Sequence, residues 1–430
     1  ILLIMEPEME QTEIEKYLAP YLYILEVMQS GTVNSRNYFS TQAAILLHDV
    51  DMMISLLDDY DVILAPGSDE TTLGEDWSYN HQGYPQSGNY GVASLLDRET
   101  VGYSLLSGTK FEVRSPYKYN MAKWMYYMFE PIMYKGGNMI MYGGRSFSGG
   151  SNEQNAGAQV IAAMLDLIGA YGLDDDERLK KMVKRHVTDE NIQDILRFLN
   201  INQLIKLQQV LEDHSVEPGH YEMAYVYYTG DRVVQHRNGY AFGLAMSSSR
   251  IPTYSSINQA NQKGWYTGDG MTYLYLDHDV YQYGGDYRTN VNPYHLPGVT
   301  NDTQQRAELS LRQSYFPDQD FVGAVQLKDK YFTAAMAYES FHNDVPPTGD
   351  YEDGGGMLPL HDSSLVAKKA WFAFDEEIVA LGTGIRAEDG YEVATTVDNR
   401  RLIEVIDRFP DTEEDTIPYL IENVTAVGSD

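Results

Sequence analysis

The sequence predicts an α+β protein whose chain is helical up to about residue 215 and rich in β-strands from residue 216 onward. In the first half, apolar residues recur at helical spacing. In the second half, short aromatic and β-branched runs alternate with turn residues, as in strands. Helices followed by strands indicate segregated domains, which we place at residues 1–215 and 216–430, and argue against repeated βαβ units. The length of 430 residues also exceeds one ordinary core.

Several stretches of the first half carry the helical pattern. Residues 13–28 form the first, and Pro20 is expected to kink or divide it. A capping-box pattern at residues 151–154 opens a helix that extends to Ile168. The remaining helices are predicted at residues 43–57, 189–199 and 204–211.

The strands begin with a predicted hairpin. Residues 223–228 and 232–234 are aromatic and β-branched, and the Thr-Gly-Asp turn at 229–231 joins them. Later strands are predicted at residues 272–276, 321–327, 331–338, 371–374 and 378–381.

Composition limits the classes of function. The net charge of −32 is spread along the chain, which argues against nucleic acid or an anionic membrane surface as a partner. An anionic substrate would therefore need a locally positive pocket. The chain has no cysteine, so disulfides and thiolate chemistry are excluded. No apolar run approaches the length of a membrane span, and the first residues lack the basic start of a signal peptide.

Several other patterns have ordinary structural interpretations. The charged residues 174–185 are read as the solvated face of a helix, and the Met-rich residues 121–141 as core filling. His236 and His295 are read as ordinary core or surface histidines. Residues 267–270 resemble a phosphate loop only superficially, since they lack the lysine, and a tight turn is expected there.

Residues 76–91 contain the most informative stretch of the chain. His81 and Tyr90 lie nine positions apart, and Gly, Pro and Ser between them make a helix interior untenable. We therefore expect both side chains on a loop, where function is often carried. Histidine and tyrosine together offer a proton-transfer pair. Because tyrosine is abundant here, a turn with a buried aromatic remains the plain alternative.

Four segments of the chain carry distinctive motifs. They are a Gly-Thr-Val-Asn loop at residues 31–34, the His–Tyr spacing with its following glycine at 81–91, a Gly-Arg-x-x-Ser loop within 142–148, and the long stretch 248–300. Together they resemble the polysaccharide lyases of the hyaluronate, chondroitin AC and xanthan lyase family, polysaccharide lyase family 8. Residues 368–372 and 395–400 are similar to this family as well.

The resemblance implies an incomplete N-terminal (α/α) toroid, the catalytic domain, followed by an antiparallel β-sandwich domain. Family members are longer at both ends. We therefore expect that this chain lacks the first helices of the toroid and is truncated at its C-terminus.

The resemblance also assigns the catalytic residues. In such lyases the proton α to a uronate carboxylate is removed and the 4-linked oxygen is expelled, which leaves an unsaturated sugar. Asn34 and His81 would stabilise the charge that develops on the carboxylate. Tyr90 would move the protons, and Arg145 would lower its pKa from the usual value of about 10. The scheme requires no metal or other cofactor. Without the resemblance, Asn34 would be read as an Asx-turn residue, and Arg145 as a structural residue whose guanidinium hydrogen-bonds backbone carbonyls.

Substrate-binding roles are expected for Phe147, Arg250, Asn258 and Asn261, with Arg250 and Lys263 adding positive charge near the cleft wall. The implied partner is an anionic polysaccharide of the hyaluronan or chondroitin type. We expect a secreted, extracellular monomer.

Two alternatives stay open. The first is a lyase acting on the side chain of xanthan. Phe147 favours it, as does the absence of the second arginine that the family usually has four residues after the first, where this chain has Gly149. A supporting glutamate of the family is likewise replaced by Ser255. The second alternative is a non-catalytic polysaccharide-binding relative, because a fold does not guarantee an active site.

Overall fold

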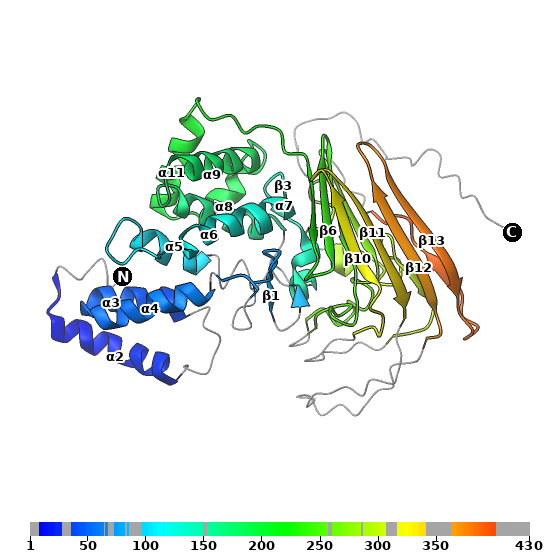
Figure 1. The fold of residues 1–430 in the computed structure, drawn as a ribbon, viewed down its shortest axis with the longest axis horizontal. Helices are drawn as coiled ribbons and strands as arrows, with labels where there is room; N and C mark the ends of the chain where they lie inside the picture. Colours follow the sequence, from blue (N-terminus) through cyan, green and yellow to red (C-terminus); the bar gives the residue numbers. More distant parts are fainter. Residues whose placement is uncertain are drawn as a thin grey trace.

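The computed structural model places a helical part beside two layers of β-sheet (Figure 1). It describes residues 8–27, 36–63, 65–67, 73–81, 84–85, 97–114, 116–148, 153–256, 260–284, 287–306, 316–340 and 363–400. Within these residues, every helix is too short or too polar to cross a membrane.

Helices dominate the described chain before residue 213. The longer ones are α2 (Gln11–Val27), α3 (Arg36–Leu47), α4 (Val50–Ile63), α5 (Asp97–Leu106), α8 (Glu153–Leu167), α9 (Leu173–His186) and α11 (Ile201–Glu212). The short ones are η5 (Tyr117–Tyr119), α6 (Asn120–Trp124), the π-helix η6 (Met125–Phe129), α7 (Glu130–Ile132), η7 (Ile140–Tyr142), η8 (Gly144–Ser148) and α10 (Ile192–Leu196). The predicted helices at 13–28, 189–199 and 204–211 are confirmed in position, although α10 is shorter than predicted. α2 runs on through Pro20 without a break in the helix.

The single helix predicted over residues 43–57 is wrong, because the chain forms α3 and α4 there. His48, between them, has a φ of 53°, which ends α3. The Asp49 side chain then accepts the backbone N–H of Met52 at 2.9 Å and caps the start of α4. Apolar periodicity continued across this break, so only the aspartate signalled it.

The core of the helical part is built around α8 and the Met-rich segment before it. Residues of α8 pack against α5, α9, α10 and α11. The buried methionines are Met121, Met125, Met128, Met133, Met139 and Met141, so the prediction of core filling is confirmed. The solvated face predicted over residues 174–185 is present, since Asp174, Glu177 and Arg178 are exposed. Arg185 is the exception, because it binds the buried carboxylate of Glu130.

The inner sheet is antiparallel with strand order β5-β6-β7-β8. Its strands are β5 (Met223–Tyr227), β6 (Arg232–Arg237), β7 (Tyr240–Ala245) and β8 (Met271–Leu276). The β5–β6 hairpin and the strand at 272–276 confirm the prediction, but β7 was missed. Alternate residues of β7 point to different cores: Ala241 and Ala245 face the helices, whereas Phe242 and Leu244 face the outer sheet. A strand buried on both faces shows no polar alternation to detect.

The outer sheet is also antiparallel, in the order β10-β11-β12-β13. Its strands are β10 (Val322–Leu327), β11 (Tyr331–Glu339), β12 (Val366–Ala373) and β13 (Ile378–Arg386), which confirms the four runs predicted there. Small two-stranded sheets pair β1 (Asn80–His81) with β2 (Tyr84–Pro85), β3 (Met133–Tyr134) with β4 (Gly137–Asn138), and β9 (Thr300–Asp302) with β14 (Val393–Thr395). A short helix, α12 (Tyr287–Asn290), follows β8.

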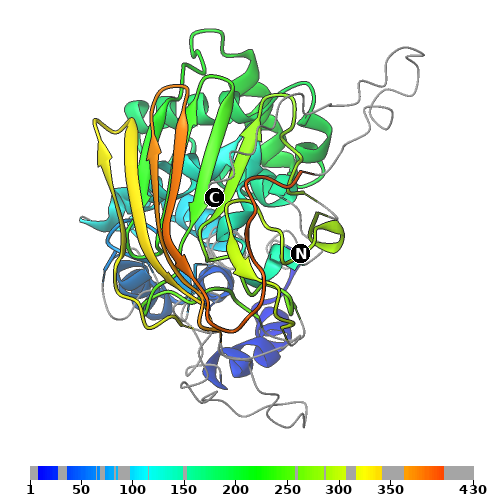
Figure 2. The same ribbon diagram turned by 90° about the vertical axis from the view of Figure 1, so that its right-hand side faces the viewer.

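The two large sheets pack face to face, as Figures 1 and 2 show from perpendicular directions. One apolar cluster joins them, in which Phe242 of the inner sheet stacks on Phe332 of the outer sheet with ring centroids 6.1 Å apart. The other face of the inner sheet shares the main core with the helices. The helical part therefore rests directly on the inner sheet, and the candidate site lies along that contact.

Candidate active site

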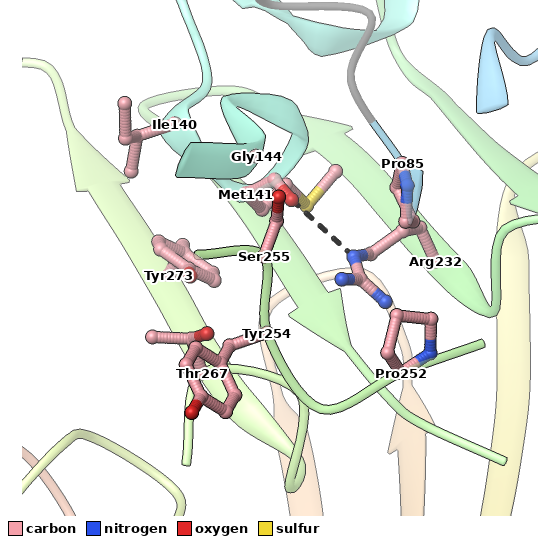
Figure 3. Close-up of a pocket in the computed structure, with 10 residues that line it drawn as sticks. All are labelled: Pro85, Ile140, Met141, Gly144, Arg232, Pro252, Tyr254, Ser255, Thr267 and Tyr273. Atoms are coloured by element: carbon pink, nitrogen blue, oxygen red, sulfur yellow. Dashed lines mark hydrogen bonds between the residues drawn. The ribbon is translucent and has the colours of Figure 1, made fainter. Parts of the chain in front are cut away.

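Three of the segments that the sequence singled out meet at one small cavity between the helical part and the inner sheet (Figure 3). Its lining residues are Pro85, Ile140, Met141, Gly144, Arg232, Pro252, Tyr254, Ser255, Thr267 and Tyr273. Its volume of about 30 Å³ suits a water molecule or two and is too small for a sugar ring. The cavity thus marks where the segments converge and is not itself a substrate cleft.

The His81 segment forms a miniature hairpin. Asn80 pairs with Pro85 and His81 with Tyr84, so this backbone is a two-residue strand pair where an irregular loop was predicted. The described part of the chain includes the backbone of His81 but not its side chain. Asn34 and Tyr90 lie outside the described residues. Pro85 brings the hairpin to the cavity (Figure 3).

A buried polar cluster anchors this hairpin to the turn between β5 and β6. Asp76 accepts the backbone N–H and the hydroxyl of Thr229, each at 2.7 Å. It also accepts the Ser78 hydroxyl at 2.7 Å. The Asn80 side chain donates to the Thr229 carbonyl and hydroxyl, both at 3.1 Å. Residues about 150 positions apart are therefore locked together directly before His81.

The Arg145 loop depends on its two glycines. Gly144 has a φ of 55°, which favours glycine. A Cβ on Gly143 would lie 2.9 Å from the carbonyl oxygen of Ile140, too close for any other residue. Arg145 itself is half-buried in η8, directly after the cavity-lining Gly144. The Gly-Gly pair thus makes a tight turn of the chain at the cavity, directly before Arg145.

The side chain of Glu153 fixes the start of this loop through a hydrogen bond. It is almost fully buried at the start of α8, where it accepts the backbone N–H of Ile140 at 2.8 Å and the hydroxyl of Tyr275. Burial raises the pKa of Glu153 to about 7, although these two donors oppose the shift. One carboxyl thus ties a helix, the Arg145 loop and strand β8 together.

Arg232 is a cavity residue that sequence reasoning missed. Its buried guanidinium, drawn in Figure 3, donates to four backbone carbonyls: those of Met141, Gly230, Asp231 and Met246, at 3.3, 3.1, 3.2 and 2.6 Å. Burial lowers its pKa, yet arginine stays charged in proteins. Arg232 therefore adds a positive charge to the cavity wall. Its position in a predicted strand, among apolar neighbours, was the only signal in the sequence.

The predicted substrate-binding residues are found in different settings. Arg250 is half-exposed and pairs with the buried Asp231 at 3.1 Å, which offsets much of its charge. Asn261 is buried and donates to the carbonyl of Ser255 at 2.9 Å, so it helps to hold this cavity-lining residue in place. Phe147 lies in η8 with its side chain outside the described residues, and Asn258 lies wholly outside them.

The predicted turn at residues 267–270 and the reading of two histidines as ordinary residues are confirmed. Residues 267–270 form turns, and Thr267 lines the cavity. His236 is a core residue whose Nε2 lies 2.7 Å from the carbonyl oxygen of Pro131, and His295 is exposed. Among the described residues, no three His, Cys, Asp or Glu side chains cluster as metal ligands would.

Comparison with protein families finds two models that match in succession. The model of the polysaccharide lyase family 8 N-terminal α-helical domain matches residues 41–185, and that of the family's super-sandwich domain matches residues 222–416.

Known proteins with similar sequences are bacterial lyases. A xanthan lyase from Bacillus sp. (strain GL1) is 32% identical over 75% of this chain and 32% of its own length. A hyaluronate lyase from Staphylococcus aureus is 28% identical over 87% of this chain and 45% of its own length. The chain thus spans about a third to a half of these relatives.

Solved structures agree with the sequence matches. A Paenibacillus xanthan lyase superposes with a TM-score of 0.79 at 30% identity, covering 93% of this chain and 36% of the other. A Streptomyces coelicolor A3 chondroitin AC lyase, solved in complex with chondroitin sulphate, superposes with a TM-score of 0.71 at 25% identity, covering 84% of this chain and 48% of the other.

Proposed function

Because this chain belongs to polysaccharide lyase family 8, we propose that it cleaves uronate-containing polysaccharide by β-elimination. The reaction breaks the bond between C4 of the uronate and its linking oxygen. The C5 proton leaves, its electron pair forms the C4=C5 double bond, and the linking oxygen takes up a proton. The products are an unsaturated uronate end and a new hydroxyl end.

Asn34 and His81 act at the uronate carboxylate in this proposal. Loss of the C5 proton adds negative charge to a group that is already an anion. Donors placed at the carboxylate stabilise that charge more in the transition state than in the ground state. The anchored hairpin supports this role, because a donor that is held in place before the reaction pays little reorganisation energy.

Tyr90 removes the C5 proton and then protonates the leaving oxygen. A phenol with a pKa of about 10 is a poor base at neutral pH unless a cation stabilises the phenolate. Arg145 supplies that cation, and we add Arg232 as a second, buried one. Both belong to chain segments that line the cavity.

One observation carries the proposal: the hairpin that bears His81 and the loop that bears Arg145 line the same cavity, although about 60 residues separate them in the sequence. The wall between them comes from β6, β8 and residues 252–255 and 267 of the sheet-rich half. Residues assigned to one reaction thus belong to segments that the fold brings together.

The substrate is proposed to be of the hyaluronan or chondroitin type, bound with help from Phe147, Arg250, Asn258 and Asn261. Xanthan side chains are the second candidate, since an aromatic Phe147 and Gly149 stand in the loop after Arg145. The similarity to two xanthan lyases supports this alternative as well.

The proposal also covers the domain architecture, the oligomeric state and the location of the protein. We assign residues 1–215 to an incomplete (α/α) toroid and residues 216–430 to an antiparallel β-sandwich domain. The protein is proposed to be a secreted monomer.

The test is incubation with hyaluronan, chondroitin and xanthan in separate reactions, while the ultraviolet absorbance of the unsaturated product is followed. Absorbance that grows with one polymer and is absent with the Tyr90→Phe variant is the expected result, and the polymer identifies the substrate. A folded protein that binds these polymers without producing absorbance would instead be a non-catalytic relative.

A further inference from the structure

The residue just after Asp76, in the turn that anchors the His81 hairpin, has an unusual backbone. Trp77 has a φ of 67°, a left-handed conformation that bulky residues rarely adopt. The turn enforces it: the N–H of Trp77 donates to the carbonyl of Gly74 at 2.9 Å, and the N–H of Gly74 donates to that of Ser78 at 2.8 Å. Strain that surrounding bonds maintain is a reason to look for a function.

The strained turn places the Trp77 ring at one end of a row of aromatic side chains. Its centroid lies 6.0 Å from that of Tyr127, which lies 6.3 Å from that of Tyr225 in a stacked arrangement. Tyr228, on the same hairpin as Tyr225, is 54% exposed. We call Trp77, Tyr127, Tyr225 and Tyr228 the aromatic row. Its members come from three distant segments of the chain, so only the tertiary structure assembles it.

A second backbone irregularity presents the middle of the aromatic row. Tyr127 lies in η6, a π-helix, and π-helical turns are rare and occur frequently at functional sites. Its neighbours Tyr126 and Met128 are buried, whereas Tyr127 is 38% exposed. The helix thus widens where it sends this ring toward solvent.

Positive charge accompanies the aromatic row. The ammonium of Lys123, an exposed residue four positions before Tyr127, lies 6.0 Å from the Trp77 ring. The guanidinium of Arg178 lies 5.9 Å from the Tyr127 ring, although it also pairs with Glu130. A negative charge lies beside the row as well, because the carboxylate of Glu75 accepts a hydrogen bond from the hydroxyl of Tyr228 at 3.3 Å. Lys123 and Arg178 thus give the aromatic row local positive charge in a chain whose net charge is −32.

Aromatic faces with adjacent cations match the chemistry of an acidic polysaccharide. The C–H faces of pyranose rings are apolar and stack on aromatic side chains, while a uronate carboxylate is attracted to Lys123. We propose that the aromatic row is a binding surface for the polysaccharide chain outside the candidate active site. This inference rests on the proposed function for the identity of the polymer.

The aromatic row is joined to the candidate active site by the same anchor. Trp77 lies three residues before Asn80, which pairs with the cavity-lining Pro85. Tyr225 donates its hydroxyl to the carbonyl of Asp76 at 3.1 Å. A polymer that lies on the row would therefore pass beside the hairpin that carries His81, and the row would hold a long chain while one bond is cleaved.

Tryptophan fluorescence tests the binding directly. The chain has four tryptophans, and three of them, Trp124, Trp265 and Trp371, are at most 3% exposed. Only Trp77 is positioned to respond to a bound sugar. The Tyr90→Phe variant, used to prevent cleavage, is titrated with hyaluronan, chondroitin and xanthan separately, and with dextran as a neutral control. We expect a saturable change in emission with at least one acidic polymer, none with dextran, and loss of the change when Trp77→Phe is added.

Two results of the titration would overturn the proposal: no emission change with any acidic polymer, or a full change that persists in Trp77→Phe. The titration is also independent of turnover. Lyase activity without an emission change rejects the aromatic row and leaves the proposed function standing. An emission change in a protein without lyase activity would support the aromatic row as a binding surface and reject the proposed lyase function.

Kinetics supply a second, independent variant in case Trp77→Phe does not fold. Tyr127→Ala and Lys123→Gln should each raise KM for the polymer about fivefold, the loss expected for one contact of this kind. A tetrasaccharide, which offers far fewer sugar rings than the polymer to lie on the row while one bond is cleaved, should be affected much less. Two substitutions away from the row serve as matched controls. Tyr391→Ala removes another exposed tyrosine, and Lys110→Gln removes an ammonium that lies 4.9 Å from the Phe111 ring. Equal losses on polymer and tetrasaccharide would show a merely structural role and refute the proposal.

Discussion

Single side chains buried between the helices and the inner sheet define the surroundings of the candidate site. Glu153 and Arg232 are both buried and both bond backbone groups next to the Arg145 loop, and the sequence analysis assigned neither of them to the site. A glutamate in a capping pattern and an arginine in a strand look ordinary in sequence. They become significant only when residues from distant segments surround them and remove water, since burial is what changes their electrostatics.

The raised pKa of Glu153 predicts a pH dependence of stability. The folded-state pKa of about 7 exceeds the usual value of 4.5, so the folded protein favours the protonated form. The contribution of this group is therefore most favourable below pH 4.5 and is lost as pH rises to about 7, on the order of 2–3 kcal/mol. Glu153→Gln, which cannot ionise and retains one acceptor oxygen, should lose less stability over this range.

Thermal unfolding at pH 5 and pH 8 measures this effect. The comparison is between the pH-induced change in the wild type and that in Glu153→Gln. Asp269, whose pKa burial also raises to about 7, is unchanged in both proteins and so cancels. Identical changes in the two proteins would mean that Glu153 does not titrate in this range.

Tyr90 is the residue on which the proposed reaction depends most. Tyr90→Phe removes the hydroxyl that moves both protons, and general acid–base catalysis typically contributes on the order of 10²–10⁴ in rate. We expect kcat to fall by at least this factor while the thermal unfolding temperature is unchanged. Near wild-type turnover by the folded variant would reject the assignment.

His81 and Asn34 give a prediction of a different kind. Their donors act on charge that grows during the reaction, so alanine substitution of either should lower kcat more than it raises KM. Steady-state kinetics on the polymer identified by the absorbance assay provide the measurement. A change confined to KM would assign the residue to ground-state binding.

At the level of elements, the anchoring of β1 is the feature with the clearest consequence. Thr229 lies in the turn between β5 and β6 of the inner sheet. Its hydroxyl donates a hydrogen bond to the Asp76 carboxylate and accepts one from the Asn80 side chain. The Thr-Gly-Asp turn was predicted from local residue types alone. Its contact with β1 was not predictable, because the two segments are about 150 residues apart.

Thr229→Val tests this anchor. Valine keeps the shape but loses the hydroxyl, which leaves buried partners unsatisfied and should destabilise the protein by about 1–3 kcal/mol. If the anchor positions His81, kcat should fall as well. Thr229→Ser, which retains the hydroxyl, is the matched control and should preserve both properties. A loss of stability with kcat unchanged would show that the anchor does not set the geometry of catalysis.

For the whole molecule, the distribution of charge decides how a polyanion reaches the site. The chain carries a net charge of −32, whereas Arg145, Arg232 and Lys123 lie at or near the surfaces proposed to bind substrate. Long-range repulsion and short-range attraction therefore oppose each other.

Salt separates these two effects. The Debye length is about 10 Å at 0.1 M, so distant acidic residues are screened before contacts at the site. Activity should rise with moderate salt and fall only at higher concentration, as measured by initial rates of absorbance increase in a sodium chloride series. A steady decline from the lowest salt upward would show that attraction dominates at all distances.

The sequence by itself determined the α+β class, the order of helices and strands, and the segments that resemble the lyase family. These features are local: periodicity, turn residues and short motifs persist whatever the chain packs against. Exceptions such as β7 and the break at His48 arose where burial or capping outweighed periodicity.

The tertiary structure alone decided which residues share an environment. It buried Glu153 and Arg232 beside the Arg145 loop, paired Arg250 with Asp231, and assembled the aromatic row around Trp77. Hydration, charge pairing and ring stacking depend on groups that lie far apart in the chain. Their energies therefore do not exist until folding brings those groups into contact and removes the water between them.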